Sequence, residues 1–318
     1  MKFKKVIVLS FVLNTNSFFL FCDFDIQKKV QEICTSVPGE MGVAALHIES
    51  GRRVEFNSHE AFPMASSYKI PIALSCLSLV DSGRLSLNQH VLFVGRSKKT
   101  PNVKKVYRVT LRKCIELMLA RSNNTTSDRV LEMTGGPFAV NSWLSRHQIY
   151  GMRIDRPVLK MRKDFAGITN FTGGKLYTRG RNGKKISLVN REKRINAIQK
   201  FYVDERDTTT PRVMVDLLAQ AFEGKLVSER STSFLFSCMA KCCTGSMRMV
   251  HLLPKHVKVY HKTGTMDGII SDVGVITLPG GKGHLVLAVY SNKSMRLTDD
   301  RALAIARIAR SLFDYFIE

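Results

Sequence analysis

Ser66-Ser67-Tyr68-Lys69 opens an apolar segment whose spacing predicts a helix over residues 66–81. Residues three apart share one face of a helix, so the Lys69 ammonium group can reach the Ser66 hydroxyl. The positive end of the helix dipole disfavours a protonated lysine there and favours an anion that develops on an attacked carbonyl. The stretch therefore predicts a serine nucleophile that a lysine activates.

Two further polar motifs follow this helix in the chain. Ser122-Asn123-Asn124 comes after a predicted helix over residues 111–120, where a hydroxyl and a carboxamide can relay a proton and hold a substrate amide. Lys262-Thr263-Gly264-Thr265 ends a predicted strand over residues 257–265 and offers a positive charge and a hydroxyl to a carboxylate. Gly264 leaves space for an extended substrate beside that strand. Each motif alone arises often by chance, whereas their combination in this order is specific.

Strand patterns lie near both ends of the chain, and helical patterns fill the middle. The strands are predicted at residues 41–49, 53–56, 257–265, 273–278 and 284–290, and terminal helices at residues 26–36 and from Asp299 onward. We therefore expect an α/β (α+β) fold with one antiparallel sheet, flanked by helices and interrupted by an all-helical lobe. The sheet lobe would comprise about residues 23–60 and 222–318, and the helical lobe about residues 61–221.

The composition excludes several classes of protein. The chain has 318 residues, of which 44% are hydrophobic, so it can bury a core and is not disordered. No apolar run reaches the ~18 residues that a membrane span needs. Seven cysteines are too few for a disulfide scaffold, and common zinc, redox and nucleotide motifs are absent, so we expect no metal and no cofactor.

The formal net charge is +23, which could indicate an anionic partner. No basic stripe interleaved with aromatic residues occurs, so we expect no nucleic-acid binding. Most of the excess charge is better explained as solvated surface, with some affinity for anionic polymers of the cell envelope.

The amino terminus indicates export. Three lysines precede the short apolar run at residues 6–13, which is typical of a secretory signal peptide over residues 1–22, cleaved after Ser17 or Cys22. We therefore expect a periplasmic or secreted protein, with a membrane-anchored form still open. Export would expose the cysteines to oxidation, and a bridge between Cys76 and Cys114 is one option.

Together, the three motifs resemble those of class A β-lactamases and penicillin-binding proteins, and from about residue 26 onward the chain resembles the class A β-lactamases. The resemblance implies an acyl-enzyme on Ser66, with Lys69 helping to deprotonate it. It assigns the backbone N–H groups of Ser66 and Thr265 to an oxyanion hole. The remaining roles are proton transfer to the leaving nitrogen by Ser122 with Lys262, binding of the acyl side chain by Asn124, and binding of the ring carboxylate by Thr263.

Two departures from the family pattern concern the omega loop and the second motif. Asn123 stands where the family usually has Asp, and we expect a structural effect more than a chemical one. The family hydrolyses its acyl-enzyme with a Glu two residues after the loop's first Arg. If that Arg is Arg156, paired with Asp207 at the neck of the loop, the position of the base holds Val158. The alternative base is Glu192, in Glu192-Lys193-Arg194-Ile195-Asn196, which resembles the family's E-x-x-L-N.

Residues 157–203 form a basic insertion, with twelve lysines and arginines against two acids. A solvated loop is the simpler interpretation of this segment, with a helix predicted at residues 189–202.

The sequence thus predicts a monomeric serine hydrolase that opens β-lactam amides. The main alternative is a penicillin-binding D-alanyl-D-alanine carboxypeptidase or transpeptidase, which shares the nucleophile and differs in how the acyl-enzyme is resolved. A slow-turnover β-lactam-binding protein, or a cell-wall or peptide-binding protein without turnover, is a further alternative. The binding protein without turnover is disfavoured, because the sequence keeps Ser66, Lys69, Ser122 and Lys262.

Overall fold

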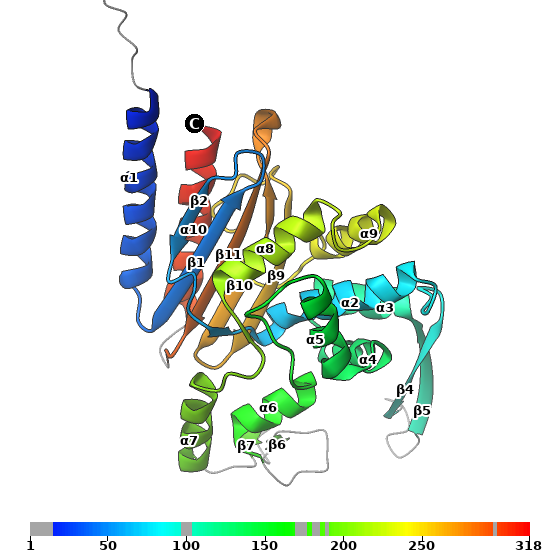
Figure 1. Ribbon diagram of the computed structural model, residues 1–318. Helices are drawn as coiled ribbons and strands as arrows, with labels where there is room; N and C mark the ends of the chain where they lie inside the picture. Colours follow the sequence, from blue (N-terminus) through cyan, green and yellow to red (C-terminus); the bar gives the residue numbers. More distant parts are fainter. Residues whose placement is uncertain (1–14, 97–103, 169–176, 180–184, 188–190, 295–297) are drawn as a thin grey trace, which may run out of the picture.

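Five strands from the two ends of the chain form the central sheet of the computed structural model (Figure 1). The structure describes residues 15–96, 104–168, 177–179, 185–187, 191–294 and 298–318. Residues 1–14, which carry much of the predicted signal peptide, lie outside these ranges. Within them, no helix is both long and apolar enough to cross a membrane.

The sheet is antiparallel throughout and has the order β2-β1-β11-β10-β9. Its strands are β1 (Glu40–His47), β2 (Arg53–Phe56), β9 (Val259–Met266), β10 (Ile269–Thr277) and β11 (His284–Asn292). The predicted sheet from both chain ends is confirmed, and β9, which carries Lys262 to Thr265, lies at one edge. An edge strand has alternate N–H groups that point away from the sheet, and these are available to a ligand.

Helices cover both faces of the sheet. α1 (Thr15–Thr35) and α10 (Thr298–Ile317) lie on one face, and α8 (Pro211–Phe222) lies on the other (Figure 1). The apolar side of α10, which includes Ile305, Ile308 and Leu312, is buried against the sheet. α1 begins earlier than the predicted start at residue 26.

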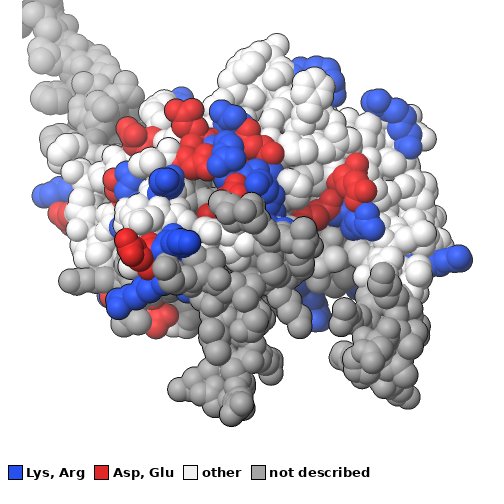
Figure 2. Space-filling view, turned by 90° about the horizontal axis from the view of Figure 1, so that it is seen from below, with Lys and Arg blue, Asp and Glu red and all other residues white. Residues whose placement is uncertain are grey.

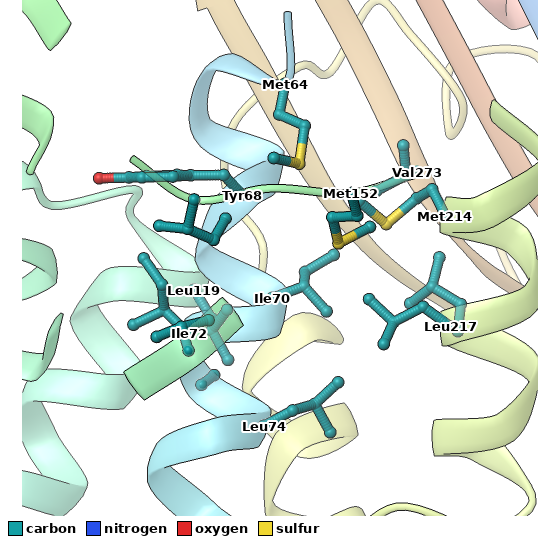
Figure 3. Close-up of a cluster of buried hydrophobic side chains, with 14 of the residues drawn as sticks. Met64, Tyr68, Ile70, Ile72, Leu74, Leu119, Met152, Met214, Leu217 and Val273 are labelled. Carbon is teal, nitrogen blue, oxygen red and sulfur yellow. The ribbon is translucent and has the colours of Figure 1, made fainter. Parts of the chain in front are cut away.

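The helical lobe is built around α2. Its helices are η1 (Ala65–Tyr68), α2 (Lys69–Asp81), α3 (Leu111–Ala120), α4 (Asn124–Met133), α5 (Gly136–Arg146) and α9 (Glu229–Met239). All residues from 69 to 77 of α2 are buried, because this part of the helix lies between the other helices and the sheet. Figure 3 shows Ile70 facing the methionines Met152 and Met214, while Ile72 lies against Leu119. This packing fixes the start of α2, where the first motif lies.

Some elements were not predicted. A hairpin, β4 (His90–Arg96) and β5 (Lys104–Thr110), projects from the helical lobe (Figure 1). The described part of the basic insertion holds α6 (Val158–Ala166), the short hairpin β6 (Tyr177–Arg179) and β7 (Lys185–Ser187), and α7 (Arg191–Tyr202), which agrees with the predicted helix. Two short strands, β3 (Phe62–Pro63) and β8 (Thr208–Thr209), pair beneath η1.

The suggested bridge between Cys76 and Cys114 is not formed. Both are buried free thiols in the core of the helical lobe, and every other cysteine that the structure describes is free as well. Burial raises the pKa of the Cys76 thiol to about 12, which makes it unreactive.

Candidate functional site

The predicted nucleophile lies in a tight turn at the start of α2. Ala65 has a positive φ of 47°, a conformation that costs a non-glycine residue about 1–3 kcal/mol and is typical of functional sites. The turn is fixed by Ser67, whose hydroxyl contacts the Met64 carbonyl oxygen at 2.8 Å and the Tyr290 hydroxyl at 3.0 Å. Ser66 itself is partly exposed, while Ser67 and Tyr68 are buried. The fold therefore presents one serine of the pair to solvent.

Lys69 joins the first motif to the second. Its ammonium group is buried and donates hydrogen bonds to the Ser122 carbonyl oxygen at 2.8 Å, to Ser122 Oγ at 3.1 Å and to Asn124 Oδ1 at 2.9 Å. Burial, together with the positive charge of Lys262, lowers the pKa of Lys69 well below its usual value. Among the described contacts, no hydrogen bond joins Lys69 to Ser66, so the predicted contact between these two side chains is not made in the free protein.

The second motif is held by its middle residue. Asn123 is the N-cap of α4, and its side chain accepts a hydrogen bond of 2.9 Å from the Thr126 N–H. An amide caps a helix as well as a carboxylate does, which explains why Asn can stand here in place of Asp. The cap leaves Ser122, with a positive φ of 52°, facing Lys69.

Strand β9 has two faces with different contents, because side chains alternate along a strand. Lys262 and Gly264 lie on the face toward η1. A Cβ atom on Gly264 would stand 2.6 Å from the Met64 carbonyl oxygen and 3.1 Å from Ala65 Cβ. The glycine is thus required for the close approach of the strand to η1, whereas the sequence suggested only space for a substrate.

Lys262 is completely buried, and its ammonium group donates to the Thr263 carbonyl oxygen at 2.8 Å. Burial lowers its pKa to about 8. The positive charge of Lys262 disfavours protonation of Lys69, so an anion close to both side chains would be attracted.

The other face of β9 carries Thr263 and Thr265. Thr263 Oγ1 lies 2.6 Å from Thr244 Oγ1, and Thr265 Oγ1 accepts a hydrogen bond of 2.8 Å from Arg248. The Arg248 guanidinium also donates to the carbonyl oxygens of Gly264 and Ser271, both at 2.9 Å. Sequence reasoning missed Arg248, because no local pattern indicates that it folds back onto the strand.

The predicted pair at the neck of the loop is present. Arg156 Nε lies 2.6 Å from Asp207 Oδ2, and both side chains are buried. The same guanidinium contacts Asp164 and Asp204, each at 3.0 Å. Although burial disfavours its charge, these carboxylates raise the pKa of Arg156. The pair therefore closes the loop and ties the start of the insertion to its end.

Replacing Arg156 with alanine is expected to destabilise the protein by about 3–5 kcal/mol, because Asp207 would stay buried without its cation. Urea unfolding monitored by circular dichroism measures the loss. The matched control is Arg310→Ala, which removes an exposed pair with Asp314 at 2.8 Å and should change the stability little, because solvent screens an exposed pair. Similar losses for the two variants would contradict a closing role for Arg156.

If Arg156 is the first Arg of the loop, the position expected for the deacylation base falls at the start of α6. Val158, two residues after Arg156, is buried, and its N–H donates to Asp128 Oδ1 at 2.6 Å. Asp128 also accepts from the Leu159 N–H at 3.1 Å, and burial raises its pKa. Asp128 was not singled out in the sequence, since it is an inconspicuous residue within α4. Glu192 lies exposed in the first turn of α7, with no described contact to Ser66 or Lys69.

Comparisons with known proteins agree on one family. A family model described as the β-lactamase enzyme family matches residues 25–316. The β-lactamase VEB-1 of Pseudomonas aeruginosa is 25% identical over 91% of this chain and 89% of its own, and a β-lactamase of Bacteroides uniformis is 24% identical over 91% and 90%. Among solved structures, the extended-spectrum β-lactamase TLA-3 has a TM-score of 0.75 at 25% identity, covering 93% of this chain and 100% of that one. A β-lactamase from Chitinophaga pinensis has a TM-score of 0.70 at 26% identity, covering 91% and 98%.

Proposed function

This chain belongs to the β-lactamase enzyme family, and we propose that it opens the β-lactam amide through an acyl-enzyme on Ser66. The proposal rests on the hydrogen bonds by which Lys69 joins the first motif to the second. One buried ammonium group, at the start of the helix that follows Ser66, bonds to both Ser122 and Asn124. Gly264 meanwhile brings the third motif against the same turn. The three motifs thus meet at one place, as a serine acylation site requires.

Activation of the nucleophile rests on Lys69. Its lowered pKa makes the neutral amine easier to form than in an ordinary lysine, and a neutral amine can accept the Ser66 proton. The present hydrogen bonds to Ser122 and Asn124 hold the amine within the site. Substrate binding would bring Ser66 and Lys69 into direct contact, because hydrogen bonds in free enzymes often tighten only in the complex.

The leaving nitrogen needs a proton when the amide bond breaks. The Ser122 hydroxyl, 3.1 Å from Lys69 Nζ, is placed to pass on the proton that Lys69 takes from Ser66. Such positioned proton transfer typically contributes 10²–10⁴-fold to a rate. Backbone N–H groups of Ser66 and Thr265 are the proposed oxyanion hole, supported by the position of Thr265 on the edge strand.

Substrate recognition is assigned to the groups around β9 and to Asn124. Asn124 Oδ1 accepts from Lys69, which leaves its NH₂ group to donate to the carbonyl of an acyl side chain. Lys262, Thr263 and Arg248 supply two cations and a hydroxyl for the ring carboxylate.

Replacing Lys262 with alanine is expected to slow acylation by at least ~10²-fold, because the substrate carboxylate and Ser122 both lose their cation. The wild-type rate should also fall as the pH rises through about 8, where Lys262 loses its proton. Lys262→Arg should remove that falling limb, since arginine stays charged. Stopped-flow acylation rates across pH measure both effects. An unchanged rate in Lys262→Ala would show that this motif is coincidental.

Turnover of a chromogenic cephalosporin, compared with cleavage of a D-alanyl-D-alanine peptide, tests the choice of substrate. The curated relatives and solved structures named above are all β-lactamases, which supports the lactam. Peptide cleavage without cephalosporin hydrolysis would replace the proposal by the peptidase alternative.

Location and partners follow from the charge and the amino terminus. We propose an exported monomer whose excess of positive charge, +23 for the full chain, gives it affinity for anionic polymers of the envelope. On the described part of the face in Figure 2, lysines and arginines lie among acidic residues, which fits diffuse attraction better than one focused site. Binding to anionic vesicles that is lost in high salt would support this, and salt-independent binding would not.

A further inference from the structure

A second group of reactive side chains lies on the face of β9 that carries Thr263. His261 Nδ1 is 2.9 Å from Asp272 Oδ1, and both residues are buried. The Cys242 thiol lies close enough to the same histidine for each group to shift the pKa of the other. Cys242, His261 and Asp272 therefore form an electrostatically coupled series on three separate segments, and the acylation mechanism uses none of them.

Electrostatics within this series favour a thiolate. Burial opposes the charge on both partners, but Asp272 and Cys242 raise the pKa of His261 to about 10. A protonated His261 in turn lowers the pKa of Cys242 to about 7, although burial alone would raise it. A thiolate beside an imidazolium is the arrangement found in reactive cysteines.

A cavity of about 560 Å³ gives access to the thiol. Cys242 and His261 line it, together with the exposed Cys243. Lys255 and Lys258 line the same cavity, so its positive electrostatic potential favours an anionic ligand. The cavity is large enough to admit a small organic disulfide but not a folded partner.

Cys242 is linked through Thr244 to Thr263, the residue proposed to bind the ring carboxylate. Its sulfur lies 3.3 Å from Thr244 Oγ1, which in turn lies 2.6 Å from Thr263 Oγ1. A Cβ atom on Gly245 would stand 2.5 Å from Thr263 Cγ2, so the segment is packed directly against the strand. A change at the sulfur must therefore move Thr244, and with it the Thr263 hydroxyl.

We propose that Cys242 is a thiol-modification site at which small carboxylate-bearing disulfides form a mixed disulfide that slows acylation of Ser66. The Cys242 thiolate attacks one sulfur of the disulfide, a new S–S bond forms, and the old one breaks. The leaving thiolate takes a proton from solvent. One disulfide bond is consumed and one is made, so the disulfide itself is the only oxidant required. The modification is independent of the proposed function, while its effect on acylation rests on it.

Oxidised glutathione is the probe, and peptide mapping by mass spectrometry gives the rate at each cysteine of the purified full chain. At pH 7, Cys242 should react about three to six times faster than a free cysteine in solution, since its larger thiolate fraction outweighs its lower nucleophilicity. The midpoint of its pH profile should lie at about 7 and should move upward in His261→Asn. In Lys255→Glu/Lys258→Glu the preference for glutathione over the cationic disulfide cystamine should be lost.

The coupling is measured as the rate of acylation by a labelled penicillin before and after glutathione treatment. A roughly five- to tenfold decrease is expected, as for one lost neutral hydrogen bond, with full recovery on reduction. Cys242→Ser should be insensitive to glutathione, while Cys243→Ser should respond like the wild type. Modification only at Cys243, or modification of Cys242 without any change in acylation, would overturn the proposal. If glutathione modifies Cys242 but no penicillin acylates the protein, the thiol site stands and the proposed β-lactamase function is wrong.

Discussion

Replacing Ser66 with alanine is expected to abolish covalent capture of a penicillin by this protein. Ser66 is the exposed hydroxyl of the turn before Lys69, while the neighbouring Ser67 is buried and bonded to Met64 and Tyr290. Loss of the nucleophile typically costs about 10⁴–10⁶-fold in rate, so no acyl-enzyme should form on the timescale of the assay. Intact mass spectrometry after incubation with a labelled penicillin measures the adduct.

The matched control is Ser82→Ala, because Ser82 lies exposed just beyond the far end of α2. This variant should be acylated at the wild-type rate. Circular dichroism should show that Ser66→Ala keeps its fold, since a partly exposed hydroxyl without a described hydrogen bond contributes little to stability. An adduct that persists in Ser66→Ala would end the assignment of this serine as nucleophile.

The spacing of apolar residues predicted most of the helices and strands, and the three motifs could be read directly from the sequence. Strand β2 and helix α3 have the predicted bounds, because alternation and helical periodicity reflect burial on one side of an element. The chain ends could be assigned to one sheet since an antiparallel arrangement accounts for strands at both termini. Asn123 could be recognised as a departure from the family pattern, and the N-cap that explains it is itself local.

What the sequence could not provide depends on segments that meet only in the folded chain. Arg248 becomes part of the site because its segment folds back over β9, and Asp128 matters because it receives the backbone of α6. The pairing of Cys242 with His261 is likewise tertiary, because the two residues lie on segments that meet only in the folded chain. The bond from Lys69 to Ser122, instead of Ser66, depends on the positive φ of Ser122, which sequence patterns do not reveal.

The acyl-enzyme is expected to accumulate, because the described site lacks a carboxylate that is free to activate water. Hydrolysis of the ester needs a water molecule held near Ser66 and a base of suitable pKa. Val158 occupies the position where the family pattern requires Glu, and the nearby Asp128 accepts two backbone N–H groups. Absence of a general base typically costs 10²–10⁴-fold, so deacylation should be slower by about that factor than in an enzyme that has the base, and the acyl-enzyme should persist.

The exposed Glu192 is the remaining candidate from the sequence. It lies in the first turn of α7, whose Arg194 forms an ion pair with Asp267 in the turn between β9 and β10. That pair brings α7 near the end of the β9 strand, so a rearrangement of the helix in the substrate complex would be needed to carry Glu192 to the ester. On the geometry of the free protein, Glu192→Gln should change neither acylation nor deacylation.

Stopped-flow acylation with a chromogenic cephalosporin, followed by intact-mass detection of the acyl-enzyme, distinguishes the mechanisms. Wild type and Glu192→Gln should both show a burst and then a slow steady state with most of the protein acylated. Glu229→Gln, an exposed glutamate in the first turn of α9, is the matched control and should behave identically. Loss of steady turnover in Glu192→Gln alone would identify Glu192 as the base and contradict the prediction. Fast turnover that survives Glu192→Gln would contradict it as well, and the buried Lys69, with its lowered pKa, would then be the group that activates water.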